Sequence, residues 1–92
     1  MERRTGWTFL SNHSHVLIAI AKHRDLRIRD LADEVGITER AVAQILYDLQ
    51  AAGILTKRKK GRRNVYHVNA DVPLRHPVES HRTVGDILRL AE

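Results

Sequence analysis

Residues 28–49 of the chain read Ile28-Arg-Asp-Leu-Ala-Asp-Glu-Val-Gly-Ile-Thr-Glu-Arg-Ala-Val-Ala-Gln-Ile-Leu-Tyr-Asp-Leu49. Apolar residues recur every three or four positions on both sides of Gly36, which is the spacing of two amphipathic helices. Glycine ends the first helix because it accepts a left-handed backbone without a Cβ clash. Thr38 is a good N-cap for the second helix, and Glu39 suits the positive end of its dipole.

The second of these helices has an apolar side and a polar side. The apolar stripe consists of Val42, Ile45, Leu46 and Leu49. At about 100° per residue, Arg40, Gln44 and Tyr47 point the opposite way. Ala32 is expected where the two helices cross, because only a small side chain fits there. An ordinary helical hairpin is the alternative, but these offsets favour a DNA-binding helix-turn-helix.

The composition is that of one small soluble domain. The chain has 92 residues, no cysteine, and a net charge of +5. The lack of cysteine excludes disulfides and thiolate metal sites and fits a reducing cytoplasm, where we expect the protein to work. No apolar run approaches the length of a membrane span, and no signal-type apolar segment follows the N-terminus, so no membrane partner is expected.

The positive charge is concentrated in one segment. Lys57 to Arg63 holds six basic residues and no acid, while the rest of the chain has ten basic against eleven acidic residues. This is the pattern of an element that binds a polyanion. A solvated basic turn is the alternative, since blocks of like charge are often only surface.

The segments before the helix-turn-helix are an arm and a helix. Residues 1–10 form the arm, whose Trp7 and Phe9 are expected to cover a core edge or a partner. Ser11 or Asn12 then caps a helix that runs to about Arg24 and is apolar on nearly every side, so we expect it to be buried on more than one face.

A short connection leads from this helix into the helix-turn-helix. Arg27 and Ile28 are expected to form a brief strand. Arg29 is a poor N-cap for the helix that follows, whereas Asp30 near its start is favourable.

A β-hairpin is predicted after the second motif helix, which stops at Gly53. The strands are 54–58 and 64–68, and the turn 59–63 contains Gly61, which supplies the positive φ that a hairpin needs. Asn64, Tyr66 and Val68 share one face of the second strand. A basic hairpin directly after a helix-turn-helix is a wing.

Residues 71–92 are predicted to be a linker with two prolines followed by a helix over 77–90. The apolar side of this helix needs a partner, which is either the first helix of the same chain or a second copy. We favour a two-fold interface built from both helices. Its predicted residues are Trp7, Phe9, Leu17, Val84, Ile87, Leu88 and Ala91.

Taken together, the order of elements over residues 11–70 resembles the winged-helix transcriptional regulators of the MarR and ArsR type. The resemblance rests on the helix-turn-helix, on Gly53-Ile-Leu55 and on the basic hairpin ending Val65-Tyr-His-Val68. It implies a mainly α fold with a small β-hairpin (α+β): a three-helix core, a wing and a C-terminal helix. It also implies a homodimer that binds double-stranded DNA.

The resemblance places one face of the second motif helix in the DNA groove. That face carries Thr38, Arg40, Ala43, Gln44 and Tyr47. Arginine can bond guanine and glutamine can bond adenine, so we expect base contacts there, including Ala43 and Tyr47, although an exposed helix surface is the alternative. Backbone contacts are expected from Thr38 and the wing. The wing residues are Lys57, Lys59, Lys60, Arg62 and Arg63.

No catalytic or metal site is expected. The six histidines show no set of ligands at a metal-binding spacing, and there is no phosphate loop, nucleophile elbow or carboxylate pair, so we expect neither a cofactor nor an enzyme. The favoured function is a sequence-specific transcriptional regulator that acts as a repressor. The alternative is a winged helix for protein or RNA interaction. A small-molecule effector is compatible with the resemblance, but no residue pattern points to one.

Overall fold

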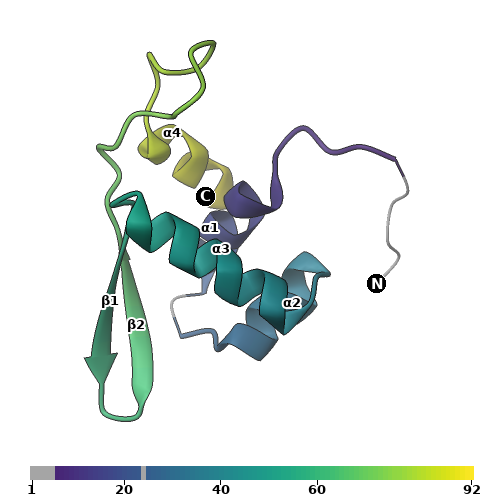
Figure 1. Ribbon diagram of the computed structural model, residues 1–92, viewed down its shortest axis with the longest axis vertical. Helices are drawn as coiled ribbons and strands as arrows, with labels where there is room; N and C mark the ends of the chain where they lie inside the picture. The colour runs from purple at the N-terminus through teal and green to yellow at the C-terminus, as the bar shows by residue number, and fades with distance from the viewer. Residues whose placement is uncertain (1–5, 24) are drawn as a thin grey trace.

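A helical body with a protruding β-hairpin makes up the fold (Figure 1). The structure is a computed structural model that describes residues 6–23 and 25–92. The elements are α1 (Asn12–Lys22), α2 (Ile28–Val35), α3 (Glu39–Ala51), β1 (Leu55–Lys60), β2 (Arg63–Val68), α4 (Val84–Leu88) and the 3-10 turn η1 (Arg89–Ala91). The predicted α+β architecture of a three-helix core, a wing and a C-terminal helix is confirmed. Within the described residues, no helix has the length and apolar character needed to cross a membrane.

The first helix, α1, occupies the centre of the fold and packs against α2, α3 and α4. The Ser11 hydroxyl caps it by accepting a hydrogen bond from the Ser14 N–H at 3.4 Å. Its buried residues are Val16, Leu17, Ala19 and Ile20. The prediction that this helix is buried on more than one face is therefore confirmed. It ends at Lys22, and the predicted end at Arg24 lies outside the described residues, as do residues 1–5 of the arm.

The start of α2 differs from the prediction. Arg27, not Arg29, is the N-cap, and the strand predicted at Arg27 and Ile28 is wrong. The Arg27 backbone N–H donates to the Asp30 carboxylate at 3.1 Å, so the donor that a strand would use closes a capping box instead. Ile28 is already the first residue of the helix.

The turn of the helix-turn-helix forms as predicted. Gly36 has a φ of 83°, and its N–H and that of Ile37 donate to the Ala32 carbonyl at 2.8 and 3.1 Å. The Thr38 hydroxyl then accepts from the Ala41 N–H at 3.0 Å and starts α3. Ala32 is 5% exposed, in agreement with its predicted place at the helix crossing.

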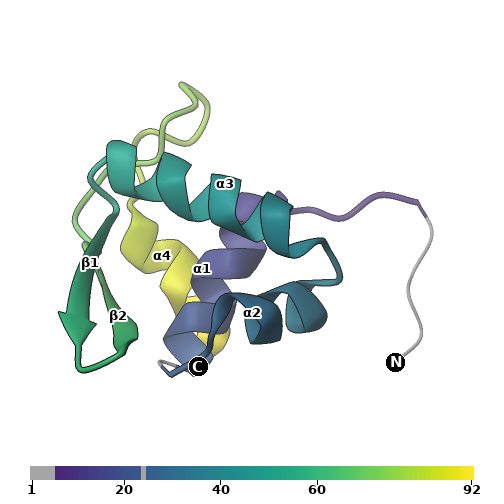
Figure 2. The same cartoon turned by 60° about the horizontal axis from the view of Figure 1, so that its bottom comes forward.

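The wing is an antiparallel hairpin that leaves the C-terminal end of α3 (Figure 2). Its strands are longer than predicted, so that only Gly61, with a φ of 65°, and Arg62 remain in the turn. Leu55 pairs with Val68, and both lie against the core. The predicted faces of β2 are confirmed, because Tyr66 and Val68 pack on the core while His67 is exposed.

The C-terminal helix is much shorter than predicted, and the helix predicted over 77–90 is wrong. Residues 75–82 form bends and turns, Thr83 pairs with Pro73 in an isolated antiparallel bridge, and α4 begins only at Val84. The chain instead closes a loop, because the Leu74 N–H donates to the Arg82 carbonyl at 2.9 Å and the Val84 N–H donates to the Val72 carbonyl at 2.8 Å. The Thr83 N–H donates to the Asp86 carboxylate at 3.0 Å, which completes a capping box for α4.

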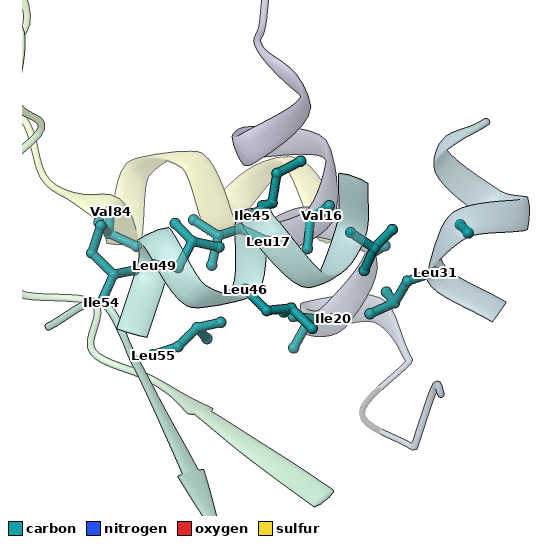
Figure 3. Packing of buried hydrophobic residues seen from close by; sticks show 13 residues of the cluster. Val16, Leu17, Ile20, Leu31, Ile45, Leu46, Leu49, Ile54, Leu55 and Val84 are labelled. Atoms are coloured by element: carbon teal, nitrogen blue, oxygen red, sulfur yellow. The ribbon is translucent and has the colours of Figure 1, made fainter. Parts of the chain in front are cut away.

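This C-terminal segment adds to the core that α1 and α3 build. Val84 is 1% exposed and lies beside Leu49 and Ile54 in the buried cluster (Figure 3). The other large contributions come from the inner side of α3 and from α1. The C-terminal segment therefore packs on the same core as the helix-turn-helix through Val72, Leu74, Val84 and Leu88.

The left-handed backbone of Gly36 provides a test of this turn. Replacing Gly36 with alanine puts a Cβ into that conformation and should lower the free energy of unfolding by about 1–2 kcal/mol in urea titrations. Gly36→Asn is the matched control. Asparagine tolerates the left-handed region, so this variant should lose less of the free energy of unfolding than Gly36→Ala. Equal losses in both variants would contradict this account of the turn.

Candidate nucleic-acid interface

The outward side of α3 is a polar surface fixed by the burial of its other side. Val42 and Leu46 are 0% and 3% exposed, and they hold the helix against the core. The residues that were predicted to contact bases all lie on the exposed side: Arg40, Ala43, Gln44 and Tyr47. Tyr47 is 66% exposed. Among the described residues, Arg40 has no hydrogen-bond or ion-pair partner, so its guanidinium is available to a ligand.

Gln44 is held in place by a chain of hydrogen bonds that crosses from α3 to α1. Its amide nitrogen donates to one oxygen of the Asp48 carboxylate at 2.9 Å. The other oxygen of Asp48 lies 2.9 Å from Nε2 of His13. The amide of Gln44 is thus oriented by a residue one turn along α3, which is in turn fixed by α1.

The same contacts favour the charged form of Asp48. The hydrogen bond from His13 and then that from Gln44 hold the pKa of Asp48 below its ordinary value of 3.8. Asp48 is therefore an anion over the physiological range, and it draws the Gln44 nitrogen inward. The Gln44 oxygen and its second N–H remain for an outside partner.

The wing carries positive charge on both of its faces. The pairing register places Lys57 and Lys59 on the face of Tyr66, and Arg58 and Lys60 on the opposite face. All of these basic side chains are exposed. Arg58 was missed as an individual site residue, although the period-2 alternation of a strand would have assigned it to the same face as Lys60.

Arg63 differs from the other basic residues of the wing. Its guanidinium donates to the backbone carbonyl of Asp25 and so ties β2 to the connection between α1 and α2. Arg62, in the turn, is exposed. Among the residues that the structure describes, Arg63 is thus the one basic residue of the wing whose side chain has a hydrogen-bond partner.

The residues predicted for a dimer interface fall into two groups. Trp7 and Phe9 are 77% and 91% exposed, and their rings meet edge to face with centroids 4.8 Å apart. Leu17 and Val84 are buried in the chain's own core at 3% and 1% exposure, so they have no surface to give to a partner. The remaining three lie half-buried near the C-terminus: Ile87, Leu88 and Ala91.

Metal-ligating side chains do not gather in the part of the chain that the structure describes. No three His, Asp or Glu side chains come together there in a way that would hold a metal ion. The acidic and histidine side chains that do meet form pairs, such as His13 with Asp48.

The fold and this surface define a winged helix-turn-helix protein. One solved structure of similar fold is that of the zinc-dependent MarR family transcriptional regulator AdcR in its Zn(II)-bound state, with a TM-score of 0.51 and 19% sequence identity. The likeness covers 75% of this chain and 49% of that one, so the chain spans about half the length of AdcR. No family model matches the sequence, and no curated protein was found to be similar to it. The predicted MarR-like fold is confirmed.

The contact between His13 and Asp48 can be tested by titration. Replacing His13 with alanine removes the largest cause of the lowered pKa, so the pKa of Asp48 should rise toward 3.8 when its carboxyl carbon is followed by NMR. The pKa of Asp86, which is lowered first by its hydrogen bond from the Thr83 backbone, serves as the internal control and should not move.

The same variant should change how stability depends on pH. Because folding lowers the pKa of Asp48, its stabilising contribution is present above its unfolded pKa and is lost as the pH falls through the folded value. The His13→Ala variant should have a smaller acid-induced loss of stability in this window. An unchanged titration of Asp48 in the variant would show that His13 does not hold it.

Proposed function

We propose that this protein is a transcriptional regulator that binds double-stranded DNA in a sequence-specific way. The observation that supports this most is the exposed polar side of α3 beside a wing that carries the whole positive excess of the chain. In winged helix-turn-helix proteins of this shape, the second motif helix enters the major groove. The chemistry of α3 and of the wing fits that use.

Base reading is assigned to the side chains in the N-terminal half of α3. The free guanidinium of Arg40 can form two parallel hydrogen bonds with guanine O6 and N7. Gln44, oriented by Asp48, offers an amide oxygen and an N–H that match adenine N6 and N7. Ala43 and Tyr47 complete this surface, where a small apolar side chain can contact a thymine methyl group.

Contacts to the DNA backbone are assigned to Thr38 and to the wing. The Thr38 hydroxyl accepts its capping bond from Ala41, which leaves its own proton to donate to a phosphate at the N-terminus of α3. The wing neutralises phosphates beside the groove that α3 enters. The wing residues concerned are Lys57, Arg58, Lys59, Lys60, Arg62 and Arg63.

The regulator is proposed to act as a homodimer and as a repressor. Two copies related by a two-fold axis would place two α3 helices about 34 Å apart and so read an inverted repeat. A dimer bound across a promoter would block access to it. The exposed pair of Trp7 and Phe9 supports a self-contact, since large exposed aromatic side chains are unfavourable in a free protomer.

The role of Arg40 can be measured on a preferred duplex selected from random DNA. Replacing Arg40 with alanine should cost about 1–3 kcal/mol at that site and relax the preference at one base pair. Lys22→Ala removes one exposed positive charge from α1 and is the control, which should keep the preference. A wild-type chain that binds all duplexes alike, or RNA equally well, would favour the alternative of a winged helix for RNA or protein contact.

The wing can be tested through the salt dependence of binding. Replacing Lys59, Lys60 and Arg62 with glutamine removes three positive charges and should weaken binding to every duplex. The slope of log K against log salt should fall by about two to three, since each phosphate contact contributes about 0.9. Fluorescence anisotropy at several salt concentrations measures this slope.

The control for the wing variant removes the same charge elsewhere. Lys22, Arg82 and Arg89 are exposed and lie outside α3 and the wing. Their replacement by glutamine should leave the slope nearly as it is. A slope that falls equally in both triple variants would show that only net charge matters and that the wing has no specific place on DNA.

A further inference from the structure

A cleft opens between the start of α1, the C-terminal end of α3 and the C-terminal segment. Its volume is about 510 Å³, which lies in the range of pockets that hold a small-molecule ligand. The floor is apolar and includes Leu49, Ile54 and Val84, while polar side chains such as His13 and Arg75 stand at its rim. Ser11, the residue that joins the arm to α1, also lines it.

The arm beside this cleft carries two aromatic side chains that its own protomer does not bury. Trp7 and Phe9 are 77% and 91% exposed. Their edge-to-face contact and the hydrogen bond from the Thr8 hydroxyl to the Leu10 carbonyl, at 2.7 Å, give the arm a defined shape. In both views the arm runs away from α4 and from the loop that closes the cleft (Figures 1 and 2).

We infer that two copies of the chain exchange these arms, so that Trp7 and Phe9 of each copy fill the cleft of the other. This inference rests on the homodimer of the proposed function and names its contact surface. The five residues 6–10 span at most about 18 Å when extended, and they start at the rim of the cleft. An exchange around a two-fold axis near Ser11 therefore needs no rearrangement of the core.

The area that such an exchange buries is enough for a small specific interface. A Trp or Phe side chain buries about 150–250 Å² when it is covered. Two aromatic side chains from each copy bury about 600–1,000 Å² in total, and the cleft walls that they cover bring the buried area to the lower end of specific protein–protein interfaces. If Trp7 and Phe9 were removed, the arm would have too little apolar surface to form an interface of this size.

The charges around the cleft do not oppose its occupation by the arm of a second copy. The positive excess of the chain lies in Lys57 to Arg63, and none of these residues lines the cleft. At the rim, the acids Asp48 and Glu79 are set against Arg75. A guanidinium at this place can also stack on an aromatic ring, which favours Trp7 or Phe9 as the occupant.

The first test compares oligomeric states by light scattering. The full chain should be a dimer at tens of micromolar, and Trp7→Ala/Phe9→Ala should raise the dissociation constant at least about a hundredfold, as expected for two buried aromatic anchors. Both side chains are exposed in the protomer, so circular dichroism of the variant should show an unchanged fold.

The second test uses the absence of native cysteine, which makes each disulfide report one contact. A chain with Thr8→Cys, which keeps both aromatic side chains, is mixed with a chain carrying Ala51→Cys at the exposed edge of the cleft. Mild oxidation should link the two chains to each other. Glu34→Cys, exposed on α2 and outside the cleft, is the matched control and should not link.

The outcomes separate this inference from the proposed function. A full chain that stays monomeric overturns the homodimer and the exchange together. A dimer that persists in Trp7→Ala/Phe9→Ala overturns the exchange and leaves the homodimer. A doubly substituted chain, Thr8→Cys/Ala51→Cys, that closes its disulfide within one chain shows that each arm fills its own cleft, which also overturns the exchange.

Discussion

The burial of one side of α3 fixes every surface that the chain offers to a partner. Val42, with no exposed surface, and Leu46 lock the rotation of the helix about its axis against α1. Because successive residues turn by about 100°, a shift of one position would bring Gln44 toward the core and break the network with Asp48. The direction in which the wing leaves is set by the same helix, since β1 starts a few residues after α3 ends.

Local signals in the sequence were sufficient for the helix-turn-helix and the wing, and insufficient for the C-terminal segment. Gly36, Thr38 and Gly61 act on their immediate neighbours, so their effect could be predicted. The helix predicted over 77–90 failed because backbone pairing between 72–74 and 82–84 competes with helical bonds. The capping pair Thr83 and Asp86 was a local sign of the true start at Val84.

In the candidate site too, features set by local sequence were predicted and contacts between distant residues were not. The outward direction of Arg40 and Gln44 follows from helical spacing alone, so it was predicted. The hydrogen bond between His13 and Asp48 joins residues 35 positions apart, and no periodicity in the sequence predicts such a pair. Asp48 also lines the cleft, so if Gln44 reads a base and the arm of a second copy fills the cleft, both contacts involve one carboxylate.

The two-stranded sheet of the wing has a further consequence for the free protein. Both strands are edge strands, and their unpaired N–H and C=O groups are open to the strands of other copies. The run from Lys57 to Lys60 places four like charges along one of these edges, and like charges oppose the joining of two identical edges. Charged side chains on an exposed edge strand are one of the means by which proteins avoid edge-to-edge aggregation, so the basic residues of the wing have a use in the free protein that is independent of DNA.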